Sequence, residues 1–133
     1  MVKGVIVALD LPDAESAVAM AERTSQYVVG FKIGLGLLTG PGPLVISAVV
    51  ALGKPVFVDA KLHDIPSQVE IAARNLGRHG ARWVTAHVAG GQAMLEAAVR
   101  GLREGSGDAP AGILGVTVLT SLDQSALARV GID

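Results

Sequence analysis

The sequence has no cysteine among its 133 residues, which excludes disulfide bridges, thiolate metal sites and cysteine nucleophiles. Aromatic side chains make up only 3%, so there is no stacking surface for the bases of a nucleic acid. The formal net charge is −1, which gives no electrostatic reason for binding nucleic acid or an anionic membrane. The lack of cysteine fits a cytoplasmic protein.

Long apolar runs are also missing. The run VIVAL near the N-terminus (5–9) is too short for a signal-peptide core or for a membrane span. The longest stretch of low charge, 33–53, is interrupted by two prolines and several glycines, and we interpret it as a loop followed by a buried helix. With 50% hydrophobic residues, the chain is long enough for a single domain, 1–133, with a real core.

Five apolar, β-branched runs stand out in the chain. Their apolar residues are nearly continuous, which is typical of parallel strands covered on both faces. Helical patterns lie between them, the first with Asp13 as its N-cap candidate, and successive runs begin 23 to 31 residues apart. This rhythm predicts repeated βα units with right-handed crossovers. The predicted strands are 4–10, 27–34, 55–61, 82–88 and 112–120, and the predicted helices are 13–24, 42–53, 66–80, 90–105 and the start of 121–131.

Two architectures fit this rhythm: a doubly wound open sheet and a run of units from a (β/α)8 barrel. Polar residues at the carboxyl ends of all five runs favour the barrel, whose active site lies at that rim. A doubly wound sheet usually carries a glycine-rich phosphate loop, but the glycine spacing of GLGLLTGPG (34–42) is wrong for one, and we predict a βα loop there. Because a complete barrel needs about 250 residues, we predict an α/β fold of TIM-barrel type with about five βα units. The rim residues are Asp10, Lys32, Asp59 with Lys61, His87 and Thr120.

The segment VFVDAKLHDIP (56–66) ends a buried strand with several ionisable groups. Residues two apart on a strand point to the same side, so Asp59 and Lys61 are expected to interact, either as a structural ion pair or as part of a site. Alternating acids and bases at one rim, with Lys32 and Asp64 added, would hold Lys61 protonated and ready to donate a proton. His63 is expected to point away as a structural residue, while a role for His87 in the pocket stays open.

Several segments of the sequence resemble those of a known family. FVDAKLHDIP (57–66) closely resembles the D-x-K-x-x-D-I-P signature of the orotidine 5′-monophosphate decarboxylase family. VALD (7–10), FKIG (31–34), VTAHVAGG (84–91) and GVTVLTSLD (115–123) follow in the family's order. The resemblance implies a (β/α)8 barrel that dimerises through its active-site face. It also implies conversion of orotidine 5′-phosphate to uridine 5′-phosphate, in pyrimidine biosynthesis, without cofactor or metal.

The resemblance also implies a role for each matching residue. Lys61 is the general acid that protonates C6, Asp59 lies beside the substrate carboxylate, and Asp64 reaches across the dimer interface into the partner's site. The remaining substrate contacts would be Asp10 and Lys32 at the ribose hydroxyls, Ile65 near the pyrimidine, Thr120 at the base end, and Gln68. Gln68 stands where the family commonly has threonine, so an amide replaces the hydroxyl expected near the ribose.

The sequence leaves two alternative hypotheses about function open. The related 3-keto-L-gulonate 6-phosphate decarboxylases and hexulose-phosphate synthases share D-x-K-x-x-D but use Mg²⁺ with a glutamate ligand on the second strand, where this chain has Lys32. The other alternative is a non-catalytic partial barrel, because the family's phosphate-binding loop and its arginine follow the fifth strand. Residues 1–133 alone would also expose the edges of the first and fifth strands, so they are expected to be poorly soluble or oligomeric and to have little or no activity.

Overall fold

The computed structural model describes residues 4–132, and residues 1–3 and 133 lie outside this range. Within it, five parallel strands form one sheet in chain order, from β1 to β5. A doubly wound sheet would reverse this order at a switch point, so the doubly wound alternative is wrong. The strictly sequential order is that of consecutive units of a barrel, and the predicted fold class is confirmed. The strands are β1 (Ile6–Ala8), β2 (Gly30–Gly34), β3 (Val56–Leu62), β4 (Ala81–His87) and β5 (Gly112–Val116).

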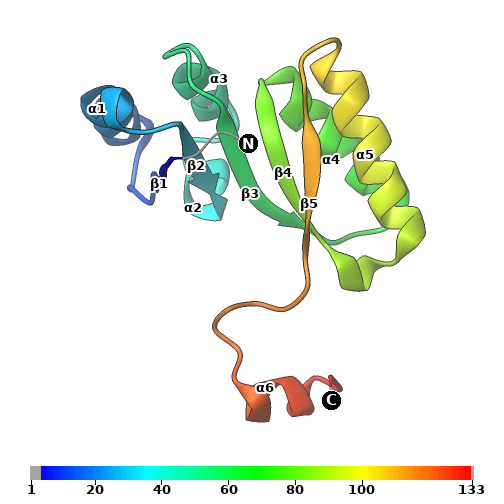
Figure 1. Ribbon diagram of the computed structural model, residues 1–133. Helices are drawn as coiled ribbons and strands as arrows, with labels where there is room; N and C mark the ends of the chain where they lie inside the picture. The colour runs from blue at the N-terminus through cyan, green and yellow to red at the C-terminus, as the bar shows by residue number, and fades with distance from the viewer. Residues whose placement is uncertain (1–3, 133) are drawn as a thin grey trace.

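Helices follow every strand, as the alternating pattern predicts (Figure 1). Asp13 is the predicted N-cap of the first helix, and its carboxylate accepts a 2.7 Å hydrogen bond from the backbone N–H of Ser16. None of the helices in residues 4–132 combines the length and apolarity needed to cross a bilayer. The helices are α1 (Ala14–Thr24), α2 (Leu35–Thr39), α3 (Leu44–Val50), α4 (Pro66–Arg78), α5 (Gln92–Ser106) and α6 (Gln124–Arg129), with short 3₁₀ segments η1 (Ser25–Tyr27) and η2 (Val88–Gly90).

One face of the sheet is packed against the helices and forms the core. We call it the covered face; it carries Phe31, Ile33, Val56, Val58 and Val84, all fully buried. Because successive strand residues alternate between faces, the neighbouring positions point the other way. We call that side the open face; it carries Lys32, Phe57, Asp59, Thr85 and Leu114. Leu114 is 43% exposed there, so the two faces differ in their contact with solvent.

Helices α4 and α5 pack closely on the covered side. A Cβ atom at Gly101 would collide with the backbone carbonyl of Glu70, and one at Gly105 would collide with that of Arg74. The two glycines therefore allow the helix backbones to approach each other. Two ion pairs, Glu70 with Arg100 and Arg74 with Glu104, also cross the same contact. This close packing holds the units around β3 and β4 in a fixed relation.

The structure differs from the sequence expectations at two loops. The segment 34–42 is not simply a loop, because it contains α2, which buries Leu37 in the core. The fifth strand ends at Val116 and not at residue 120, so Thr120 lies in the following loop. Val118 and Leu119 are 38% and 37% exposed, and a strand gains little stability where its side chains stay in solvent. Figure 1 shows that this loop leads away from the sheet to α6.

Candidate active site

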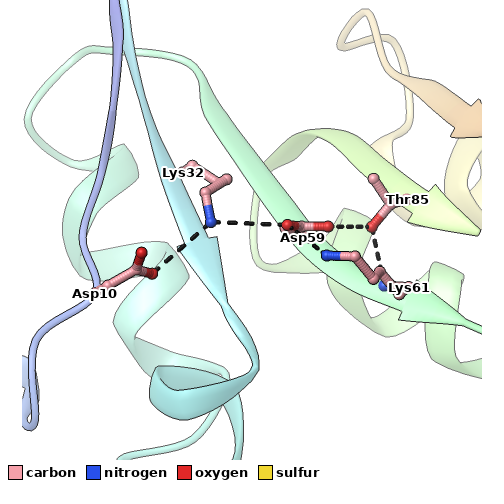
Figure 2. A network of polar contacts seen from close by, with 5 residues as sticks. All are labelled: Asp10, Lys32, Asp59, Lys61 and Thr85. Atoms are coloured by element: carbon pink, nitrogen blue, oxygen red, sulfur yellow. Dashed lines mark hydrogen bonds and ion pairs between the residues drawn. The ribbon is translucent and has the colours of Figure 1, made fainter. Parts of the chain in front are cut away.

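Four charged side chains form a continuous chain on the open face, from β1 through β3 (Figure 2). Lys32 on β2 lies 3.7 Å from Asp10 and 3.7 Å from Asp59, measured between its Nζ and a carboxylate oxygen of each. Lys61 donates a 2.8 Å hydrogen bond from its Nζ to Oδ2 of Asp59. Asp59 thus lies between two ammonium groups, with the charges alternating in sign along the chain.

The sheet register explains how Lys32 and Asp59 meet. Gly34 on β2 is paired with Asp59 on β3. Lys32 is paired with Phe57, which lies two residues before Asp59 and on the same face of the sheet. A lysine side chain is long enough to reach the next position along the neighbouring strand. Asp10 follows the end of β1 and is 70% exposed, so the chain of charges runs from solvent to the half-buried Asp59 and Lys61.

Asp59 and Lys61 are in contact as predicted, but β3 is not a regular strand between them. Lys61 has φ of +48°, in the left-handed region that non-glycine residues rarely adopt. The register with β4 shifts at the same place: Val58 pairs with Val84, but Leu62 pairs with Ala86. Four steps along β3 therefore match two along β4, which is a β-bulge. Bulges commonly redirect a side chain next to an active site.

Thr85 on β4 belongs to this site, although the sequence reasoning did not select it. Its side chain is buried, its Oγ1 accepts a 2.9 Å hydrogen bond from the backbone N–H of Lys61, and its hydroxyl donates a 2.8 Å hydrogen bond to Oδ1 of Asp59. The available signal was a hydroxyl residue inside the otherwise apolar run VTA of the fourth strand. A buried polar side chain in such a run needs a partner.

The surroundings of Asp59 keep it ionised. Burial on its own would raise the pKa of the Asp59 carboxyl. Hydrogen bonds from Lys61 and Thr85, together with the charges of Lys61 and Lys32, outweigh the burial and hold that pKa below its usual value of 3.8. The site therefore presents a fixed anion beside a lysine ammonium group.

Thr120 lies at the same site despite its place in a loop. A cavity of about 470 Å³ opens over the open face and is lined by Thr120 together with both members of the Asp59–Lys61 pair. Its remaining lining residues are Val116, Val118, Leu119 and Ser121. A cavity of this size is within the range of small-molecule sites, and it combines an apolar wall with a few polar groups.

Asp64, Ile65 and Gln68 do not join the chain of charges within the described residues. Oδ1 of Asp64 accepts a 2.6 Å hydrogen bond from the N–H of Ile65, and its carboxylate makes no ion pair with Lys61 inside residues 4–132. Within the described residues of one chain, the structure therefore does not bring the Asp64 carboxylate into contact with Lys61. Ile65 is 62% exposed, and Gln68 is exposed in the first turn of α4.

His63 and His87 lie against each other beside the site, with ring centroids 5.2 Å apart. Neither ring is hydrogen-bonded to Asp59, Lys61 or Thr85 in the part of the chain that the structure describes. Across residues 4–132, no group of three or more histidine, aspartate or glutamate side chains is arranged to hold a metal ion. The polar groups in contact on the open face are the ammonium groups of Lys32 and Lys61, the carboxylates of Asp10 and Asp59, and the hydroxyl of Thr85.

Comparisons with known proteins agree with this geometry. The profile of the "Orotidine 5'-phosphate decarboxylase / HUMPS family" matches residues 3–132. The chain is 46% identical to an orotidine 5′-phosphate decarboxylase of Paramagnetospirillum magneticum, covering 100% of this chain and 58% of the relative. It is also 46% identical to that of Moorella thermoacetica, covering 97% and 53%. The chain thus spans little more than half the length of these curated relatives.

Solved structures give the same result. A crystal structure of orotidine 5′-phosphate decarboxylase from Lactobacillus acidophilus superposes with a TM-score of 0.83 at 32% identity, over 97% of this chain and 59% of that one. An uncharacterized conserved protein from Geobacillus kaustophilus gives a TM-score of 0.84 at 38% identity, over 93% and 59%. The sequence match over nearly all described residues, together with this structural agreement, shows that the chain belongs to the orotidine 5′-phosphate decarboxylase / HUMPS family.

Proposed function

We propose that the protein at its natural length is an orotidine 5′-phosphate decarboxylase, a carboxy-lyase that forms uridine 5′-phosphate and CO₂. The observation that carries this proposal is the Lys61 ammonium group, 2.8 Å from Asp59, at the wall of the cavity on the open face. Relatives at 46% identity that carry this name support it.

The chemistry requires a cation at one carbon of the substrate. When the bond between C6 and the carboxylate breaks, its electron pair stays in an sp² orbital at C6, which the pyrimidine π-system cannot delocalise. An ammonium group fixed at that carbon stabilises the developing negative charge, and its proton then forms the new C6–H bond. In the proposal Lys61 is this group, and solvent restores its proton after the product leaves.

Asp59 has two roles in the proposed reaction. Its carboxylate fixes the Lys61 ammonium, and its low pKa keeps it charged throughout the working pH range. It also lies where the substrate carboxylate would approach, so that charge repulsion is relieved as CO₂ departs. This type of ground-state effect adds to stabilisation of the transition state and does not replace it.

The other polar residues are proposed to orient the nucleotide. Lys32 and Asp10, at the solvent end of the charge chain, would bind the ribose hydroxyls. Thr120 would contact the base end, because it lines the same cavity as Lys61. Rigid orientation of this kind contributes to rate because it holds the reacting carbon against its proton donor.

We further propose a homodimer in which Asp64 serves the partner's site, while Ile65 near the pyrimidine and Gln68 near the ribose contact the substrate. The support is their exposure at the end of β3 and the start of α4, together with the lack of an ion pair between Asp64 and its own Lys61 within the described residues. We place the activity in the cytoplasm, because a phosphorylated, charged substrate does not cross a lipid bilayer unaided. No cofactor takes part in the proposed reaction.

The magnesium-dependent alternative receives no support from this site. The Nζ of Lys32 lies between the carboxylates of Asp10 and Asp59, so a cation of the protein already occupies the position between them. A divalent ion placed there would meet electrostatic repulsion from that ammonium group.

The test is a direct assay of the purified protein at its natural length. We expect the ultraviolet absorbance of orotidine 5′-phosphate to change as uridine 5′-phosphate forms, at the same rate with and without EDTA. Turnover of 3-keto-L-gulonate 6-phosphate in place of orotidine 5′-phosphate, or loss of all turnover in EDTA, would contradict the proposal.

The behaviour of residues 1–133 expressed alone stays a prediction. We expect self-association and little turnover, because apolar side chains such as Leu114 are exposed on the open face. Size-exclusion chromatography and the same absorbance assay at high protein concentration measure both. A monomer with full turnover would show the prediction to be wrong.

A further inference from the structure

The hydrogen bonds around Thr85 form a closed ring. The backbone N–H of Lys61 donates to Oγ1 of Thr85, the Thr85 hydroxyl donates to Oδ1 of Asp59, and the Lys61 ammonium donates to Oδ2 of Asp59. Lys61 is therefore tied to Asp59 at both of its ends, directly through the side chain and indirectly through its own backbone (Figure 2).

The direction of these hydrogen bonds is fixed by the groups involved. A threonine hydroxyl has one proton to donate and lone pairs to accept with. Because the backbone N–H of Lys61 can only donate, it uses a lone pair of Oγ1, and the hydroxyl proton stays available for Asp59. The carboxylate can only accept, so no alternative arrangement satisfies all three groups.

The ring forms at the point where the sheet is irregular. The β-bulge takes the N–H of Lys61 out of the regular β3–β4 ladder, and Lys61 adopts a positive φ. A half-buried N–H without a partner is unfavourable, and a left-handed lysine persists only where its surroundings hold it. The buried Thr85 hydroxyl supplies both the partner and the restraint.

We propose that Thr85 is a positioning residue, which sets the location of the Lys61 ammonium by holding the Lys61 backbone and the Asp59 carboxylate in one hydrogen-bonded ring. Its effect on turnover rests on the function proposed above. Thr85 does not exchange protons with the substrate; it determines where the proton donor stands. A displacement of about 1 Å in such a group can lower a rate by roughly 100-fold.

The experiment compares Thr85→Val with Thr85→Ser in the protein at its natural length. Valine keeps the shape and removes the hydroxyl, whereas serine keeps the hydroxyl and removes a methyl group. We expect kcat for orotidine 5′-phosphate to fall roughly 10- to 100-fold in Thr85→Val, with KM changed less than about threefold, and Thr85→Ser to stay near wild type. Thr24→Val is the matched control, because it removes a hydroxyl that donates 2.8 Å to the carbonyl of Met20, away from the site.

A second readout does not depend on activity. Loss of the Thr85 hydrogen bond should raise the pKa of Asp59, as followed by carboxyl carbon NMR, because that hydrogen bond stabilises the ionised carboxylate. The acid limb of the pH–rate profile should shift upward with it. If wild type shows no turnover, the proposed function fails, and the titration still decides whether the ring exists.

Two outcomes would overturn the proposal. One is Thr85→Val with wild-type kcat and an unmoved Asp59 titration. The other is an equal loss in Thr85→Val and Thr85→Ser, which would make packing and not the hydroxyl responsible. Should Thr85→Val fail to fold, Thr85→Ala removes the same hydroxyl without placing a second methyl group against Asp59, and the same outcomes apply to it.

Discussion

The side chains on the two faces of the seven-residue strand β3 are held in place by different interactions. Val56 and Val58 point to the covered face and are fully buried among helices, so their contribution comes from removing apolar surface from water. Asp59 and Lys61 face the cavity, half-buried, and are held by hydrogen bonds, opposite charges and a bulge. The positive φ of Lys61 and the larger register shift against β4 lie in the segment that carries the charges, and a smaller register shift lies between Val56 and Phe57.

Because of this difference, the residues that stabilise the fold are not the residues proposed to carry the reaction. Burial on the covered face is shared among many side chains and tolerates small changes at a modest cost. On the open face each group depends on named partners, so a single substitution removes a defined interaction. Changes on the covered face should therefore alter unfolding with little effect on the reaction, and changes on the open face should do the reverse.

The largest effect is expected for Lys61→Ala. Removing the proposed proton donor should lower kcat at least about 1,000-fold, because both the positive charge at C6 and the proton are lost. The free energy of unfolding should change by no more than about 1 kcal/mol, since the ion pair with Asp59 is partly solvated. Absorbance assays and urea unfolding measure the two quantities.

Lys54→Ala is the control for Lys61→Ala. Lys54 lies just before β3, at the end of the strand remote from the charges, and lines a different cavity. Its removal should leave turnover within about twofold of wild type, since it contacts none of the charged groups. Comparable losses in both variants would mean that general surface charge, and not the position of Lys61, determines the rate.

Val58→Ala is expected to have an intermediate effect, which falls on stability and not on activity. Truncating this fully buried side chain should lower the free energy of unfolding by about 2 kcal/mol, from lost apolar burial and the cavity left behind. The kcat of the folded fraction should stay within about threefold of wild type. Val130→Ala, at a position that is 62% exposed, should change stability by less than about 0.5 kcal/mol. A large loss of kcat in Val58→Ala without unfolding would show that the covered face also determines activity.

The smallest effect is the dependence of stability on pH that Asp59 contributes. Because its pKa is lower in the folded chain than its usual value of 3.8, its contribution is present above that value. It is lost as the pH falls through the lower, folded value. Wild type should therefore lose more unfolding free energy than Asp59→Asn between about pH 5 and pH 3. Denaturant unfolding across this range measures the difference.

Some acid sensitivity should remain in Asp59→Asn. The N-cap carboxylates Asp13 and Asp123 also have lowered pKa values, mainly because they accept backbone hydrogen bonds from Ser16 and Ala126. Asp108→Asn removes an exposed loop carboxylate and serves as the control for the loss of one charge. If Asp59→Asn and wild type show the same slope, the ionised Asp59 contributes nothing to folding.

Much of the fold could be predicted from periodicity. Five apolar runs with helical patterns between them indicated parallel βα units, and the sequential sheet order confirms the barrel type. The least accurate predictions were element ends. The fifth strand stops at Val116 because the residues after it remain exposed, and α2 forms inside a glycine-rich segment because Leu37 packs into the core. Local composition does not show that Leu37 is buried or that the residues after Val116 are exposed.

The site was predicted in part, for a similar reason. The D-x-K spacing and the position of Lys32 on the preceding strand brought Asp59, Lys61 and Lys32 together in the sequence reasoning, and they are in contact. Thr85 was missed because its partners lie 24 and 26 residues away in the chain, so only the register of β3 against β4 reveals the contact.

The sequence by itself determined the order of elements, the parallel sheet and the presence of an acid and a base at the end of β3. These features depend on local preferences and on the two-residue period of a strand, which act over a few neighbouring residues. Only the tertiary structure decided the bulge, the positive φ of Lys61 and the hydroxyl ring through Thr85. Those features arise because the longer segment Val58–Leu62 of β3 and the shorter segment Val84–Ala86 of β4 must stay hydrogen-bonded side by side, and that constraint exists only after the chain has folded.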